Sequence, residues 1–489
     1  MKNNLEKGVS GMMWMSIMTA GNFGVQLVIT FFLARLLTPS DYGEVAALTV
    51  LTGFADIFWM MGVGPGIVQK DKVTDDDIST GQNLNILFGL IVFAVINIFA
   101  HFFVNIFGIS DINMLRVFST VFVINSLYSV PQSLIQRACD FKVLALTKII
   151  SVIVYGVVSI SLSLVGGGAW SLVMGTIFQN MANLVIFTIK TKMILKVSIN
   201  STSAKQLLYF GAGFTIARIF SYIANNGDKY IVNRTLGKVL LGNYTKAYQL
   251  LMYPVTMLGD TLDQVLFPVL AREQKNVEQL KKAFIYGTCV IALVSVPTCI
   301  VAYWIAEDLV LFFLGEQWGK VVIPFQIMIV GLFFRIGYKL SDSLIRAIGK
   351  VYKRAYIQAI YATLVVLGAY VGHFEGLSGV AIGVTAAFTI NYFMMTFLSV
   401  KSINLSVYKL MKNVIPILLG GVICFGMIYI IIDIWGKSSN YFLNCVIVTL
   451  ITFSIYFGIY IILLRKMVDW EFNNFIKTIL RTIKRKFIK

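Results

Sequence analysis

Long apolar stretches separated by short polar breaks recur along the whole chain. About fourteen of them approach or exceed the ~20 residues that a helix needs to cross ~30 Å of hydrocarbon. They lie near residues 9–36, 42–67, 81–107, 112–135, 142–165, 168–190, 207–236, 239–268, 283–306, 320–345, 354–371, 377–399, 411–433 and 440–464. No polar stretch between them is long enough to form a soluble domain. The pattern predicts an all-α integral membrane protein.

One of these stretches, residues 207–236, carries a stripe of polar side chains. Arg218, Tyr222, Asn225 and Lys229 follow one another at i, i+4, i+7 and i+11, which places them on one face of a helix. A charged side chain at the centre of a bilayer costs ~3 kcal/mol or more, so such residues face a bundle interior or a watery cavity. We interpret this stripe as one wall of a passage through the protein.

Charged residues in other apolar stretches are candidates for the same passage. They are Asp56 in the second stretch, Asp260 and Asp263 in the eighth, and Arg335, Lys339 and Asp342 in the tenth. The alternative for any single one of them is a buried ion pair that fixes the packing of helices.

The chain also contains an internal repeat. A shift of 199 residues places Arg35 on Arg234 and Gly43 on Gly242, and in both copies this break joins two long apolar stretches. The same shift aligns the polar residues Thr19, Asn22, Gln26 and Thr30 with Arg218, Ser221, Asn225 and Lys229. Two homologous halves around a shared central site are a recurring transporter architecture. We therefore predict two six-helix bundles followed by two additional helices.

The predicted domain organisation follows from this repeat. It comprises an N-terminal bundle at 1–190, an amphipathic linker at 191–206, a C-terminal bundle at 207–400, two further spans at 401–465 and a basic amphipathic tail at 466–489.

Composition supports a membrane protein and sets its orientation. Hydrophobic residues make up 58% of the 489 residues and charged residues only 13%, whereas soluble domains are about one quarter charged. Most of the 41 Lys and Arg lie in alternate loops and in the tail, so these loops and both termini are expected in the cytoplasm. The net charge of +18 therefore reflects membrane topology, and we predict no nucleic-acid partner. The basic tail at 466–489 is suited to bind an anionic inner leaflet.

Motifs for catalysis or cofactors do not emerge. The five cysteines do not form a disulfide framework, and the two histidines, His101 and His373, are far apart and lack metal-ligand spacing. The glycines of Gly62–Gly66 stand at the end of a span rather than between a strand and a helix, which argues against nucleotide binding. We predict no enzymatic activity, no cofactor and no metal site.

Several motifs resemble those of a known family, the Wzx-type polysaccharide flippases of the multidrug/oligosaccharidyl-lipid/polysaccharide (MOP) exporter superfamily. The motifs are Ala34–Gly43, Asp56 with Gly62–Gln69, Gln136–Lys142, Asp228–Gly237, Gly242–Tyr248, Phe267–Leu270, Gly315–Trp318 and Ser341–Ala347. The resemblance covers the first 350 residues, and beyond them only the hydropathy matches. It implies a bacterial inner-membrane protein that moves an undecaprenyl-diphosphate-linked oligosaccharide from the inner to the outer leaflet by alternating access, alongside a glycan polymerase and co-polymerase.

Roles for the polar residues follow from this resemblance. Arg218 is expected to bind the diphosphate or an acidic sugar, because a guanidinium binds phosphate through paired donors, with Arg335 and Lys339 as second candidates. The remaining cavity candidates are Lys229, Asp56, and, for sugar hydroxyls, Asn22, Gln26 and Asn225. The carboxylates Asp260, Asp263 and Asp342 are predicted to form an inner gate by pairing with the cavity cations.

Two alternatives remain open. The first is a cation-coupled drug exporter of the same superfamily, which is expected to place a carboxylate in the first span, where Val9–Leu37 has none. The second is an integral-membrane glycan polymerase, which is expected to have a large outer loop with functional carboxylates or arginines.

Overall fold

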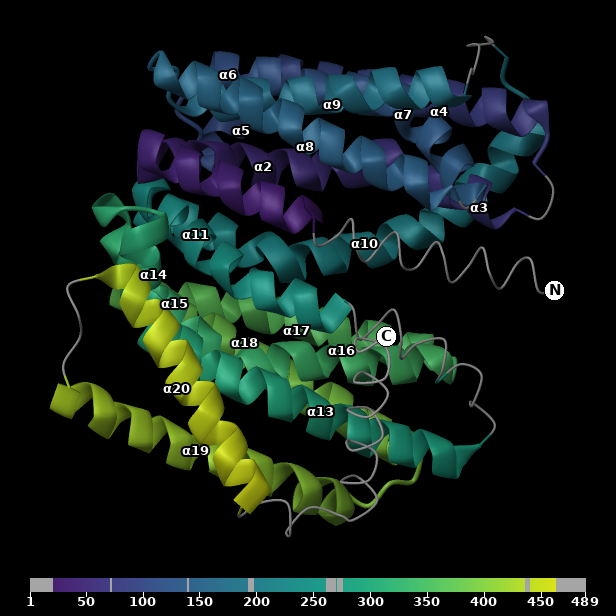
Figure 1. The fold of residues 1–489 in the computed structure, drawn as a ribbon. Helices are drawn as coiled ribbons and strands as arrows, with labels where there is room; N and C mark the ends of the chain where they lie inside the picture. Colours follow the sequence, from purple (N-terminus) through teal and green to yellow (C-terminus); the bar gives the residue numbers. More distant parts are fainter. Residues whose placement is uncertain are drawn as a thin grey trace, which may run out of the picture. The chain divides into compact units, whose positions relative to one another are not determined.

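The computed structural model describes residues 21–70, 73–138, 140–191, 198–260, 270, 276–435 and 440–462. Regular structure in these ranges is helical throughout (Figure 1). Every predicted apolar stretch falls on helices wherever it is described, so the predicted all-α membrane fold is confirmed. Among the described residues, nine helical segments are long and apolar enough to cross a membrane, or ten if the bent pair Glu316–Val330 and Leu332–Ala347 forms one span.

The chain divides into two compact units, residues 1–245 and 246–489. The first unit contains a helix over Gly21–Leu36, α2 (Pro39–Met60), α3 (Val63–Gln69), α4 (Asp75–Ile98), α5 (Ala100–Phe107), α6 (Ile112–Phe118), α7 (Thr120–Arg137), α8 (Phe141–Leu164), α9 (Ala169–Thr191), α10 (Ser201–Leu236) and the start of α11 (Lys238–Pro254). Within it, α8 packs on α9, α7 on α4 and α9, and α10 on α2, α3 and α4.

The second unit contains the rest of α11 and the later helices. These are the π-helix η1 (Val255–Asp260), α13 (Val277–Trp304), α14 (Ala306–Phe313), η2 (Glu316–Val321), α15 (Val322–Val330), α16 (Leu332–Ala347), α17 (Val351–Gly372), η3 (His373–Glu375), α18 (Gly376–Ser402), α19 (Val407–Trp435) and α20 (Tyr441–Ile462). The helices α17 and α18 pack along each other, α18 also packs on α16, and α19 packs on α13 and α20.

Some predicted spans are divided by local backbone geometry. The stretch predicted at 42–67 becomes α2 and α3 because Met61 and Gly62 adopt φ of 36° and 67°, in the left-handed region. Its start is sharp: Thr38 and Asp41 form a capping box, and Pro39 occupies the first turn. A positive φ at a methionine has no sequence signature, so hydropathy alone merges the two helices.

The boundary between the two units lies within α11, later than the predicted linker at 191–206. Near the start of α10, Gln206 accepts a hydrogen bond from Lys70 Nζ at 2.9 Å. The same Lys70 Nζ donates to Asp77 of α4 at 2.7 Å, so this end of α10 is held within the first unit. At its other end, Arg234 donates to the carbonyl of Asn105 at 2.9 Å and Asn233 donates to that of Phe107. The functional division into bundles 1–190 and 207–400 stays a prediction. The tail at 466–489 and residues 192–197 of the linker lie outside the described residues.

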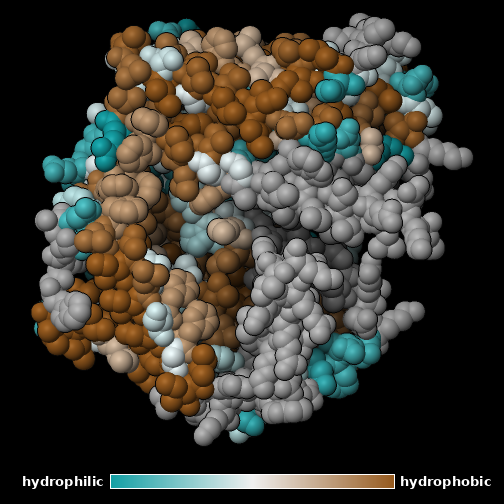
Figure 2. Space-filling model, viewed as in Figure 1, coloured by the Kyte–Doolittle hydropathy of each residue, from teal (hydrophilic) through white to brown (hydrophobic). Residues whose placement is uncertain are grey.

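On the face that Figure 2 shows, the residues drawn in colour are mostly hydrophobic. Large apolar side chains are exposed in both units, including Ile98, Val157, Val422 and Ile462. In water such a surface drives aggregation, whereas hydrocarbon accepts it. The polar side chains that lie away from helix ends are therefore the informative ones.

Candidate functional site

Arg218, on α10, lies against the carboxyl end of α2. Its Nη1 donates to Sδ of Met60, the last residue of α2, at 3.0 Å, and the side chain is half-buried. The carboxyl end of a helix carries partial negative charge from its free carbonyl groups, so this position favours a guanidinium. The predicted cavity residue thus occupies a site that suits a cation.

Asp56 belongs to the same cluster. Its Oδ1 accepts a hydrogen bond from Trp59 Nε1 at 2.5 Å, one turn along α2. The carboxylate interacts electrostatically with Arg218 and with the hydroxyl groups of Tyr128 and Tyr222. The structure therefore brings together two of the predicted site residues, Asp56 and Arg218, which lie in different spans.

Tyr222 fixes the crossing of α10 over α2. Its hydroxyl donates to the carbonyl of Val50 at 2.7 Å, and its ring lies over Gly53. A Cβ added at Gly53 would lie 2.7 Å from the Tyr222 hydroxyl oxygen, so the glycine permits this approach. Because Tyr222 stands one helical turn from Arg218, the same contact sets the position of the guanidinium.

A hydrogen-bonded pair of polar residues on two further helices belongs to the same cluster, because its tyrosine interacts electrostatically with Asp56. Tyr128 on α7 donates through its hydroxyl to Asn180 Oδ1 on α9 at 2.9 Å. Sequence reasoning missed Trp59, Tyr128 and Asn180, because none of them carries a charge that stands out in an apolar span. We define the polar cluster as Asp56, Trp59, Tyr128, Asn180, Arg218 and Tyr222.

The remaining stripe residues of α10 lie further along the helix. Asn225 is exposed and donates to the carbonyl of Ser221 at 2.7 Å, and half-buried Lys229 donates from Nζ to Asn226 Oδ1 at 3.0 Å. Asp228, next to Lys229, is buried and accepts from the Tyr244 hydroxyl at 2.6 Å. This bond joins α10 to α11, so Asp228 has a packing role that its position in the motif did not reveal.

Asn22 and Gln26, the predicted partners of sugar hydroxyls, lie on the helix over Gly21–Leu36. Gln26 is exposed, whereas Asn22 is half-buried. The Oδ1 of Asn22 is buried and accepts no hydrogen bond from the described residues. A ligand hydroxyl group is one donor that would satisfy it.

Arg335 lies within the second unit in an aromatic cage. It is 7% exposed and donates to the hydroxyl groups of Tyr361 at 2.6 Å and Tyr248 at 3.0 Å. Its guanidinium also lies 4.3 Å from the ring centroid of Phe388. Such contacts stabilise a buried cation and join α11, α16, α17 and α18. The stripe predicted on α16 therefore includes a residue that already has several partners within the protein.

Of the predicted gate residues, only the Asp342 side chain is described. Asp342 accepts from Arg354 Nε at 2.5 Å and forms an ion pair with Arg346 Nε at 3.1 Å. The side chain of Asp260 and the whole of Asp263 lie outside the described residues. Lys339 is half-buried, and its stem lies against Gly259 of η1.

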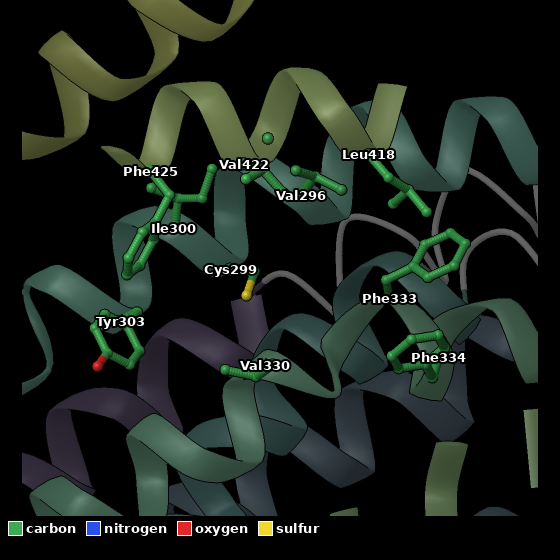
Figure 3. Close-up of a pocket in the computed structure, with 11 residues that line it drawn as sticks. Val296, Cys299, Ile300, Tyr303, Val330, Phe333, Phe334, Leu418, Val422 and Phe425 are labelled. Carbon is green, nitrogen blue, oxygen red and sulfur yellow. The ribbon is translucent and has the colours of Figure 1, made fainter. Parts of the chain in front are cut away.

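A large apolar pocket occupies the second unit (Figure 3). It has a volume of about 590 Å³ and is bounded by α13, α15, α16 and α19. Its lining consists of Val296, Cys299, Ile300, Tyr303, Val330, Phe333, Phe334, Leu418, Gly421, Val422 and Phe425. Because the polar side-chain groups of this lining are one phenol and one thiol, the pocket suits a hydrocarbon group.

Comparison with known proteins decides the family. The family model described as "Polysaccharide biosynthesis protein" matches residues 32–323, which is more than half of the chain. The chain belongs to this family. Lipopolysaccharide biosynthesis protein WzxC of Escherichia coli (strain K12) is a relative, 23% identical over 414 residues that cover 83% of each chain. The family resemblance drawn from the motifs is confirmed.

Solved structures show the same fold. The lipid II flippase MurJ, in an inward closed conformation, aligns with a TM-score of 0.76 at 16% identity and covers 91% of this chain and 98% of its own. A multidrug resistance MATE family transporter of the MOP superfamily, in an inward-facing conformation, aligns with a TM-score of 0.62 at 16% identity over 78% and 94%. At these identities the likeness describes the fold.

Proposed function

We propose that this protein is a flippase for a polysaccharide precursor. It moves an undecaprenyl-diphosphate-linked oligosaccharide from the inner to the outer leaflet of a bacterial inner membrane by alternating access. The observation that carries the proposal is the polar cluster, which places the charges of Asp56 and Arg218 inside an apolar helical unit of a polysaccharide biosynthesis family member. Ionisable residues within membrane spans mark substrate pathways.

The diphosphate is the part of the cargo that Arg218 binds. A guanidinium presents paired donors to phosphate oxygens. Until the anionic diphosphate binds, the carboxylate of Asp56 balances the positive charge of Arg218. The span is also broken next to this pair, at Met61 and Gly62. Transporters commonly bind substrate at broken helices because the ends of the helices offer unpaired backbone groups.

The lipid portion of the cargo needs an apolar path. The pocket between α13, α16 and α19 offers such a surface within the second unit (Figure 3). Outward movement of the anionic diphosphate is favoured by an inside-negative potential, worth ~2.3 kcal/mol per charge per 100 mV.

The other predicted residues take secondary roles. Asn225, Asn22 and Gln26 bind sugar hydroxyls, Lys229 lines the cavity, and Lys339 is a second candidate for binding the diphosphate or an acidic sugar. Arg335 contacts cargo only if Tyr248 and Tyr361 release it, because both now accept its donors. The inner gate consists of Asp260, Asp263 and Asp342, with Asp342 held by Arg346 and Arg354 in this structure.

Orientation and partners complete the proposal. Both termini lie in the cytoplasm, and the basic tail at 466–489 binds the anionic inner leaflet. A glycan polymerase and its co-polymerase receive the cargo at the outer leaflet.

Export by cells that lack their own copy of this protein tests the function. Arg218→Ala should abolish surface polymer while membrane abundance stays normal, and Arg218→Lys should restore export in part, since an ammonium keeps the charge but loses the paired donors. Arg116→Ala is the matched control, because Arg116 is exposed and lies outside the polar cluster. Full export by Arg218→Ala at native abundance would overturn the assignment of Arg218. Normal surface polymer without any copy of the protein would overturn the function.

A further inference from the structure

An exposed aromatic pair lies on α2 beside the polar cluster. Phe54 and Phe58 are 36% and 44% exposed, and their ring centroids lie 5.3 Å apart with the planes at 71°. The ring of Phe54 also lies 6.2 Å from that of Tyr222, which is tilted by 52°. We call Phe54 and Phe58 the aromatic step. Tyr222 joins it to Asp56 and Arg218.

Helical spacing shows which face of α2 carries the aromatic step. Gly43, Ala47, Val50, Phe54 and Phe58 follow one another at three- and four-residue intervals along one side of the helix. At the start of this face, Gly43 packs against the backbone of Gly242 in α11. The face is therefore directed towards α11 at its beginning and does not start as a lipid-facing surface.

Polar groups flank the aromatic step on the neighbouring helix. Ser221 and Asn225 are exposed on α10, one residue before and three residues after Tyr222. Polar side chains within membrane spans mostly face a bundle interior or a water-filled cavity rather than hydrocarbon. Exposed phenyl rings next to exposed amide and hydroxyl groups indicate a binding site with an apolar centre and a rim that is accessible to water.

A pyranose ring has the matching chemistry. One of its faces presents carbon-bound hydrogens that stack on an aromatic ring, while its rim presents hydroxyl groups that donate and accept hydrogen bonds. A polyprenyl chain has no such rim and gains nothing from amide neighbours. Ligand sites generally combine apolar contact area with a few placed polar groups, and this surface has both.

We propose that Phe54 and Phe58 form a stacking platform for a sugar ring of the cargo, next to the diphosphate held by Arg218. The proposal rests on the flippase function and adds a subsite to it. Tyr222 fixes the distance between the two subsites, since its hydroxyl is bonded to α2 and its ring contacts Phe54. The sugar bound there is the one closest to the diphosphate.

Binding of two defined probes tests the platform. Purified protein in detergent is titrated with a polyprenyl diphosphate that carries one hexose and with the same polyprenyl diphosphate without sugar. The unaltered protein should bind the hexose probe more tightly. Phe58→Ala and Phe54→Ala should each weaken the hexose probe about tenfold, the size of one lost ring contact, and leave the bare probe unchanged.

Two further variants keep the test decisive. Phe58→Tyr should bind both probes as the unaltered protein does, because the ring is retained. Phe178→Ala, at a phenylalanine 47% exposed on α9, is the control and should change neither probe. An equal loss on both probes, or no loss in either alanine variant, overturns the platform while the flippase function stands. Failure of the unaltered protein to bind either probe overturns both.

Access from water gives an independent test. In a variant whose five cysteines are replaced by alanine, Phe58→Cys should react with a charged thiol reagent, and the hexose probe should slow that reaction. Phe178→Cys in the same background is the comparison, with no protection expected. A Phe58→Cys thiol that does not react in the folded protein places this side chain in lipid and overturns the platform.

Discussion

Gly43 and Gly242 are in direct backbone contact. A Cβ added to Gly43 would lie 1.8 Å from the carbonyl oxygen of Lys238, and one added to Gly242 would lie 1.9 Å from that of Pro39. The shift of 199 residues that reveals the repeat places these two glycines on each other. The two copies of the repeat thus meet at equivalent residues, where α2 and α11 begin.

Substitution of either glycine should separate the two helices. Gly43→Ala and Gly242→Ala each place a methyl group inside a backbone contact that has no flexible side chain to move aside, and we expect a loss of about 1–3 kcal/mol in the free energy of unfolding. Thermal unfolding in detergent measures it. Gly426→Ala on α19 is the control, because nothing lies within 4 Å of a Cβ added there. Equal melting temperatures for all three variants would contradict the contact.

Glu44 is expected to matter more for stability than its ion-pair partner. The carboxylate is 4% exposed and accepts from the backbone nitrogens of Ser110 at 2.5 Å and Asp111 at 3.3 Å. Lys238 lies 3.6 Å away with a side chain 40% exposed. Glu44→Ala should cost about 1–3 kcal/mol because it removes a buried acceptor from the part-buried backbone donors of Ser110 and Asp111, whereas Lys238→Ala should cost about 0–1 kcal/mol. Chemical denaturation in detergent compares them, and the reverse order would refute this account.

The ion pairs of Asp342 join α16 and α17. Asp342→Asn should destabilise the second unit by roughly 1–3 kcal/mol, less than the ~3–5 kcal/mol of a fully buried pair, because Arg346 and Arg354 are each about one-third exposed. Limited proteolysis of the loop after α16 should accelerate with the same variant. Arg346→Ala alone should have a smaller effect, since Arg354 keeps the shorter bond. Identical digestion of the Asn variant and the unaltered protein would exclude this role.

Membrane topology can be tested at three positions. The distribution of Lys and Arg among the loops predicts that a reporter enzyme fused after Lys196 is active in the cytoplasm and one fused after Gly376 on the outside. A reporter fused after Gly108 should also lie outside, because the α5–α6 turn follows an odd number of predicted spans. The opposite location at any of these sites would contradict the fourteen-span arrangement.

Sequence patterns anticipated the helices better than the site. Hydropathy located the spans because the requirement to cross hydrocarbon applies to every one of them. It also singled out Arg218 and Asp56, since charge in an apolar run is conspicuous. It did not anticipate the break at Met61, the ring of Tyr222 over Gly53, or Tyr128 with Asn180. These depend on contacts between residues far apart in the chain, which no local pattern records.

Arg335 shows the opposite limit. Its spacing with Lys339 and Asp342 suggests one polar face, yet its guanidinium is enclosed by Tyr248, Tyr361 and Phe388. Periodicity assigns a residue to a side of a helix but does not say which helices cover that side. The aromatic residues that cover it come from α11, α17 and α18, and their identity as partners emerges only from the fold.

The position of α10 has a consequence for dissecting the protein. The sequence repeat places α10 at the start of the second copy, whereas its packing places it in the first unit. If the gene were divided at the linker, the N-terminal fragment would lack α10, on which α2, α3 and α4 pack. The C-terminal fragment would carry α10 without these packing partners. We therefore expect the two fragments to fold and assemble only when they are expressed together, because α10 of one fragment needs the helices of the other.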